Sequence, residues 1–218
     1  TKSAKFLIEN GADINGVFYE DEYNVLQLAV QFNNAALVKY LGNIDSDERT
    51  CFLNYQNIDG LSALHLAAIN GNTEIIQILL DHGIDQGLED NNGQSALWHA
   101  VNSGNIAAIK LLTNDKKMIN LSDHDGFTPL HIAALKNNTE ALKILIDANA
   151  DVLKQTNAGH SVLHYAVSLG NDRATRILSR YSDLINLRDL EGKTSLAIAL
   201  AINNSQIIRI LKNVRATV

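Results

Sequence analysis

The chain has 218 residues, of which 46% are hydrophobic and 19% charged, values typical of a globular protein with a sizeable core. No run of about 18 apolar residues predicts a membrane span, and the single cysteine, Cys51, excludes an intrachain disulfide framework. The net charge of −6 argues against general nucleic-acid binding, although residues 1–150 carry 9 Lys/Arg and 19 Asp/Glu (net −10) and residues 151–218 carry 9 and 5 (net +4).

The first predicted elements, within residues 1–56, are incomplete or irregular copies of a helical unit. Residues 1–16 contain AKFLIENGADIN, which resembles the second helix and turn of a unit whose first half is missing. We therefore expect the native array to begin before Thr1 and to end near the last residues of this chain. Residues 17–56 form an irregular unit, in which NVLQLAVQFNNAALVKYL has helical spacing but about five residues are inserted within positions 42–55.

Five units with a period of 33 residues follow. Their turns contain glycines at a constant spacing: Gly60, Gly93, Gly126, Gly159 and Gly192. In each unit the turn leads into a short helix opened by Ser or Thr, a break, and a second helix with Ile and Leu at helical spacing. We assign the units to residues 57–89, 90–122, 123–155, 156–188 and 189–218. Helices this short must bury their apolar faces against neighbouring units, which predicts an all-α solenoid.

The segment DGFTPLHIAALKNN…ALKILIDANAD (125–151) resembles the ankyrin repeat, with its T-P-L-H-x-A signature. The likeness extends over essentially the whole chain, although Glu22 replaces the turn glycine and Gln27 the histidine in residues 17–56. The resemblance implies a single array of helix–turn–helix units with short β-turn or hairpin fingers. It also implies that a partner protein binds the concave face, which the turn tips and first helices line.

The histidines offer no catalytic or metal-binding arrangement. His65, His131 and His164 occupy one position in separate units, and units about 10 Å apart cannot share a zinc ion whose bonds are about 2.1 Å. We expect these rings to brace the turns through hydrogen bonds, which the resemblance also implies. His160 and His164 are four residues apart but lack accompanying carboxylates, and Cys51 has no neighbouring histidine base. We predict no enzyme activity, no metal and no cofactor.

The candidate partner-binding residues lie at positions that vary between units, beside the turn glycine and along the first helix. Several are apolar where the scaffold does not require it, which is typical of an interface; the alternative is local packing. In SALWHAV (95–101), a tryptophan replaces the bracing histidine, as a tolerated core variation or as a binding anchor. The set is Tyr23, Phe32, Ile58, Leu61, Ile69, Gln94, Trp98, Phe127, Leu135, His160 and Leu169.

A cationic ladder follows one position of the second helices. Its members are Lys5, Lys39, Gln77, Lys110, Lys143, Arg176 and Arg209. The ladder either docks an acidic partner or membrane surface, or is a solvated face whose charges pair within the helix, as in Lys5–Glu9 and Lys143–Asp147.

The sequence favours a protein–protein interaction module that binds a partner protein of unknown identity through its concave face. We expect a monomer in the cytoplasm, without nucleic acid and without a membrane span. One alternative is the targeting arm of a larger enzyme, for instance a pathogen effector that acts on a host protein inside the host cell. Another is a structural spacer without a partner.

Overall fold

The structure, a computed structural model, describes residues 2–14, 16–44 and 52–215. Cys51 and part of the predicted insertion at 42–55 lie outside the described residues. The chain forms two compact units, residues 1–114 and 115–218, which are described separately below. None of the described helices is both long and apolar enough to cross a bilayer.

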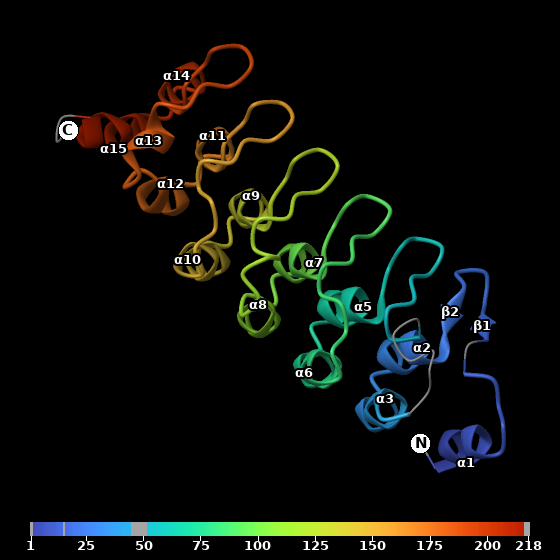
Figure 1. Cartoon of the computed structure of the whole chain (residues 1–218). Helices are drawn as coiled ribbons and strands as arrows, with labels where there is room; N and C mark the ends of the chain where they lie inside the picture. Colours follow the sequence, from blue (N-terminus) through green and yellow to red (C-terminus); the bar gives the residue numbers. More distant parts are fainter. Residues whose placement is uncertain (1, 15, 45–51, 216–218) are drawn as a thin grey trace. The chain divides into compact units, whose positions relative to one another are not determined.

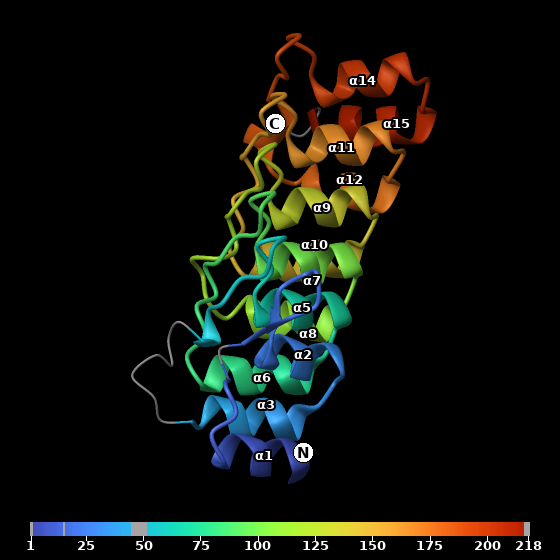
Figure 2. The same cartoon turned by 90° about the vertical axis from the view of Figure 1, so that its right-hand side faces the viewer.

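The first unit consists of helix pairs and one β-hairpin. Its elements are α1 (Lys2–Glu9), β1 (Val17–Phe18), β2 (Tyr23–Asn24), α2 (Val25–Gln31), α3 (Ala35–Gly42), α5 (Ala63–Asn70), α6 (Thr73–Asp81), α7 (Ala96–Ser103) and α8 (Ile106–Leu112). The first helices α2, α5 and α7 lie side by side in one row, and the second helices α3, α6 and α8 form another (Figures 1 and 2). The antiparallel strands pair Val17 with Asn24 and Phe18 with Tyr23.

The second unit repeats this arrangement. Its helices are α9 (Pro129–Leu135), α10 (Thr139–Asp147), α11 (Val162–Ser168), α12 (Asp172–Leu178), α13 (Ser182–Ile185), α14 (Ser195–Ala201) and α15 (Ser205–Arg215). Helices α9, α11 and α14 form the first-helix row, and α10, α12 and α15 form the second-helix row (Figure 1). Loops project from the first-helix row, and two of them close through the single bridges Gln155–Ser161 and Arg188–Thr194. The predicted all-α architecture with short turn fingers is confirmed.

Polar caps determine where the short helices begin. The side-chain oxygen of Ser62 accepts a hydrogen bond from the backbone N–H of His65, and Ser95 and Thr128 cap α7 and α9 in the same way. The second helices instead begin after asparagines such as Asn72, whose Oδ1 accepts from Ile75 N–H at 3.1 Å. Each cap satisfies one of the free N–H groups of a helix that has only two turns.

Leucines at one position of the first helices form the centre of the core in each of the two units. Leu64, Leu97, Leu130 and Leu163 are at most 1% exposed, and each comes two residues after a helix cap. In the second helices, buried positions such as Ile75, Ile76 and Leu79 face them. Burial of one such side chain contributes about 1.5–3 kcal/mol, so helices that would melt alone persist when stacked.

The turn glycines meet two steric requirements at once. Gly60 has a φ of +78°, a left-handed backbone conformation that residues other than glycine adopt only at an energetic cost. A Cβ atom at Gly60 would also lie 2.6 Å from the backbone nitrogen of Asn91 in the next turn, and one at Gly126 would lie 2.7 Å from Asn157 N. Close stacking of successive fingers therefore explains the 33-residue spacing of these glycines. At the equivalent position Glu22 also has a positive φ, of 56°.

Candidate functional site

The turn fingers are rigid because side chains and neighbouring turns hydrogen-bond their backbone. Asp90 Oδ1 accepts from the N–H groups of Asn92 and Gln94, both at 2.9 Å. Between fingers of the first unit, Asn91 N–H donates to Asp59 O at 3.0 Å, and Asn91 Nδ2 donates to Ile58 O at 2.8 Å. Asn157 makes the same two bonds to Asp125 and His124 in the second unit. The fingers therefore present their outward side chains on an ordered framework.

The junctions between first and second helices are linked in a similar way. Asn72 Nδ2 hydrogen-bonds Asn33 Oδ1, and Asn105 Nδ2 donates to Gly71 O at 3.1 Å. Beside these links lie two exposed apolar side chains, Phe32 at the end of α2 and Ile69 on α5. The first unit thus holds apolar groups from adjacent repeats on a fixed backbone.

The repeated histidine braces its own helix and the next finger. His65 Nδ1 lies 2.8 Å from Ser62 Oγ and accepts from Ser62 N–H at 3.1 Å, while Nε2–H donates to Gln94 O at 3.0 Å. Burial, followed by the nearby His99, lowers the pKa of His65 to about 4. Burial also lowers the pKa of His131 to about 4 and lowers that of His164. His65 and His164 therefore brace the turns as predicted, His164 through Nε2 and Lys193 O at 3.1 Å, whereas His131 hydrogen-bonds only its own cap residue Thr128 and its Nε2 has no partner in the part of the chain that the structure describes. No group of three His, Cys, Asp or Glu among the described residues could hold a metal.

Gln27 performs the same task in the irregular repeat. Its Oε1 accepts from Asn24 N–H at 3.0 Å, and its Nε2 donates to Leu61 O at 2.7 Å. The amide therefore reproduces both hydrogen bonds of the imidazole, although the sequence shows only a departure from the pattern. The spacing of Asn24 and Gln27 is that of a capping box, a signal that could have indicated the equivalence.

Trp98 takes the bracing position in the repeat of α7 and α8, and the polar contact moves to the next residue. Its indole is half-buried, and its buried Nε1 has no hydrogen-bond partner among the described residues. The ring lies 5.3 Å from that of His99, whose Nε2 is 2.9 Å from Asp90 Oδ2. His99 thus links helix and finger within one repeat, and Trp98 contributes apolar contact.

The structure divides the predicted partner-binding residues into two groups. The exposed group contains Phe32, Ile58, Ile69 and Leu169. The half-buried group contains Tyr23, Leu61, Gln94, Trp98, Phe127, Leu135 and His160.

Two of the half-buried residues, both in the second unit, pack against their neighbours, which is the alternative interpretation of the predicted set. The Phe127 ring lies 5.3 Å from the ring of Tyr165 and 6.2 Å from that of His131. His160 Nε2 lies 3.6 Å from Asp189 Oδ2. Substitution of either residue would disturb the fold as well as a surface.

Several exposed apolar residues were absent from the predicted set. Tyr19 is 72% exposed in the loop between β1 and β2, and Leu190 is 78% exposed in a finger of the second unit. Both occupy variable positions near the turn glycine or its equivalent, so the alignment of the repeats could have identified them as candidate binding residues. The others are Val17, Phe18, Leu153, Leu200 and Ile202, with Phe6 and Leu7 on α1.

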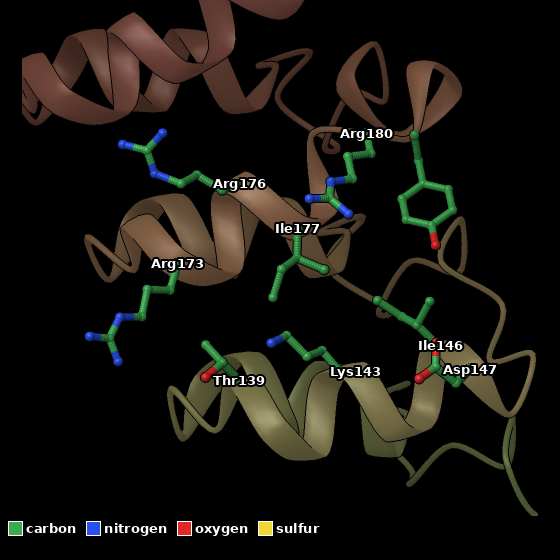
Figure 3. A pocket seen from close by; sticks show the side chains of 9 residues that line it. Thr139, Lys143, Ile146, Asp147, Arg173, Arg176, Ile177 and Arg180 are labelled. Carbon is green, nitrogen blue, oxygen red and sulfur yellow. The ribbon is translucent and has the colours of Figure 1, made fainter.

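The cationic ladder is exposed at every one of its seven positions. The predicted ion pair between Lys5 and Glu9 is confirmed, with 3.8 Å between Nζ and Oε1. The prediction of a Lys143–Asp147 pair is wrong, because no ion pair joins these two side chains. Lys143 instead faces a space between α10 and α12 (Figure 3).

Comparisons with known proteins agree with this geometry. The sequence model described as ankyrin repeats matches three overlapping copies, at residues 1–90, 26–123 and 83–156. The ankyrin repeat protein R96 of Acanthamoeba polyphaga mimivirus is 41% identical over 80 residues, which are 36% of this chain. The chain spans only 7% of the length of that relative.

A solved structure shows the same fold. The ankyrin repeat domain of Bcl-3, described as a unique member of the IkappaB protein family, matches with a TM-score of 0.82. The match covers 97% of this chain and 91% of that chain at 24% identity, and it supports the fold alone. Three matched copies over more than half of the chain, together with this fold, establish that the chain belongs to the ankyrin repeat family, whose repeats are protein–protein interaction modules.

Proposed function

We propose that the chain binds a partner protein through the fingers and first helices of its first unit. The observation that carries the proposal is the exposure of three large apolar side chains on adjacent repeats. Phe32 is 73% exposed, Ile58 56% and Ile69 38%. Large apolar groups on an ordered surface are typical anchors of protein interfaces, and aromatic ones contribute most.

Hydrogen bonds between the repeat of α2 and α3 and the next repeat, that of α5 and α6, support one continuous surface. Asn72 of the second repeat bonds Asn33, next to Phe32, and Ile58 N–H donates to Asp21 O at 3.4 Å. The backbone around both Phe32 and Ile58 is therefore tied to the neighbouring repeat. A surface that is ordered before binding loses less conformational entropy when the partner docks.

Acidic side chains surround this surface and suggest the partner's character. Burial and the carboxylates of Asp21 and Asp59 raise the pKa of Tyr23, whose hydroxyl therefore lies in a negative field. Glu20 and Glu22 are also exposed on the same finger. The partner surface that fits best is an apolar patch flanked by lysine or arginine, because complementary charge speeds association and rejects acidic competitors.

Affinity purification with the full chain and a matched pair of variants tests this proposal. Phe32→Ser with Ile69→Ser should lose the partner while the melting temperature changes little, because both side chains are exposed. The control is Leu190→Ser, which removes a side chain that is 78% exposed on a finger of the second unit. Equal recovery of the same purified partner by the double variant and the wild type would contradict the proposal.

A further inference from the structure

A second surface lies on the second helices of the second unit, whereas the proposed partner site belongs to the first unit. Helices α10 and α12 border a groove with a volume of about 540 Å³, here called the α10–α12 groove (Figure 3). Its lining residues are Thr139, Lys143, Ile146, Asp147, Arg173, Arg176, Ile177, Arg180 and Tyr181. The groove consists entirely of residues from the second unit.

The charge of the groove is unbalanced. It is lined by four cationic side chains and one carboxylate, Asp147. All four cations are exposed, and none of them forms an ion pair with any described residue. Figure 3 shows Lys143 directed into the space between the helices, with Arg173 at one end and Arg180 at the other. Like charges held together repel one another, and a bound anion would relieve that repulsion.

The floor of the groove is apolar. Ile146 on α10 and Ile177 on α12 are half-buried, and Figure 3 shows Ile177 directed toward α10. A ligand that fills the groove therefore needs both an apolar group, which the two isoleucines can contact, and negative charges, which the lysine and the arginines can bind. Arginine suits such a ligand because its planar guanidinium can donate two parallel hydrogen bonds to a carboxylate.

We propose that the α10–α12 groove binds an acidic peptide segment of a protein partner, with carboxylates on both sides of one apolar side chain. A bilayer fits less well, because the two isoleucines lie within a groove and do not project toward a flat surface. Duplex nucleic acid also fits less well, because the groove is bordered by helices of only nine and seven residues and the chain as a whole carries −6. The proposal is independent of the partner site on the first helices.

Fluorescence polarisation with the full chain tests this inference. The probe is a short fluorescein-labelled peptide of glutamates around a central leucine. The groove variant carries Lys143→Gln, Arg173→Gln and Arg180→Gln and should raise the Kd at least about tenfold, because each side chain removed could make a charge-assisted hydrogen bond. The control variant carries Lys5→Gln, Lys39→Gln and Lys110→Gln, which change the net charge equally on the ladder of the first unit, and its Kd should change less than about twofold.

Three outcomes would overturn the proposal. The first is the absence of peptide binding, and the second is an equal loss of affinity in both triple variants, which would indicate non-specific attraction. The third is that the chain binds phosphatidylserine vesicles or duplex DNA instead of the peptide, and that the groove variant abolishes this binding. A peptide of glutamates alone should bind more weakly than the probe, and equal affinity would contradict the role of Ile146 and Ile177.

Discussion

The repeat of α5 and α6 and the repeat of α7 and α8 use different chemistry to build the same element. In the first, His65 accepts from the turn before its helix and donates to the next finger. In the second, Trp98 cannot accept a hydrogen bond, and His99 instead binds Asp90 within its own repeat. Both first helices nevertheless begin at a serine cap and end at a left-handed glycine, Gly71 or Gly104.

The difference separates two requirements of the repeat. The buried leucine and the serine cap recur in both copies, and they carry the fold. The polar link between helix and finger is also present in both, but it can be made by different residues at different positions. A repeat therefore tolerates substitution of the histidine when another side chain takes over the link, and four predictions follow from that distinction.

The largest effect is expected at the shared leucine. Leu64→Asp and Leu97→Asp should each lower the free energy of unfolding by at least about 4 kcal/mol, because each removes a core side chain and buries a charge without a partner. Both leucines are 1% exposed, so the two repeats should respond alike. Urea unfolding followed by circular dichroism measures the loss. A native-like transition for either variant would contradict the assignment of that leucine to the core.

The second prediction concerns pH and tests the His65 brace of the repeat of α5 and α6. Because the folded-state pKa of His65, about 4, lies below the unfolded value of 6.5, the neutral ring stabilises the fold above about pH 6.5. That contribution to the free energy of unfolding declines as the pH falls from 6.5 toward 4. It should decrease by about 2 kcal/mol between about pH 7.5 and 5. Urea unfolding of the wild type and of His65→Gln at both pH values measures it.

The glutamine variant is the matched comparison because Gln27 already makes the equivalent hydrogen bonds in this chain. His65→Gln should keep most of the stability near pH 7.5 and lose less of it at pH 5 than the wild type does. Carboxylates titrate in both proteins and cancel in the difference. The same loss at pH 5 in both proteins would show that His65 is not the pH-sensitive brace.

Particular residues show how far the sequence could predict this structure. The 33-residue glycine spacing and the leucine positions predicted the helix pairs, because backbone conformation and burial depend on residue type at each position. The equivalence of Gln27 and His65 was not predicted, since it depends on where the amide oxygen and nitrogen point. Nor did sequence spacing reveal that Phe127 packs on Tyr165, that Lys143 and Asp147 do not pair, or that α10 and α12 border a groove. Those features depend on side-chain directions in three dimensions.

The third prediction compares the two serine caps. Ser62 Oγ accepts from His65 N–H and lies 2.8 Å from His65 Nδ1, whereas the side chain of Ser95, among the described residues, is bonded only by Trp98 N–H at 3.3 Å. Ser62→Ala should therefore cost about 2 kcal/mol and Ser95→Ala about 1 kcal/mol, since only the first also removes a side-chain contact of a buried imidazole, which keeps its bond from the backbone N–H of residue 62. Thermal unfolding of the two variants ranks them. The reverse order would mean that the histidine adds nothing to the cap.

The smallest effect on the free energy of unfolding is expected at Asp90, the hydrogen-bond partner of His99. Asp90→Asn keeps an oxygen for the N–H groups of Asn92 and Gln94 but replaces the charged contact to His99 with an amide, and should cost about 1 kcal/mol. Asn57 occupies the same turn position in the preceding repeat, where Leu66 replaces His99, so an asparagine is compatible with the finger.

Asp123→Asn is the control for that last substitution. Asp123 Oδ1 accepts from Asp125 and Phe127 N–H, but the residue equivalent to His99 is the buried Ile132. Its replacement should cost less than about 0.5 kcal/mol, because the amide oxygen keeps both turn hydrogen bonds and no histidine contact is lost. Equal losses for the two variants in urea unfolding would show that the His99–Asp90 contact contributes nothing to stability.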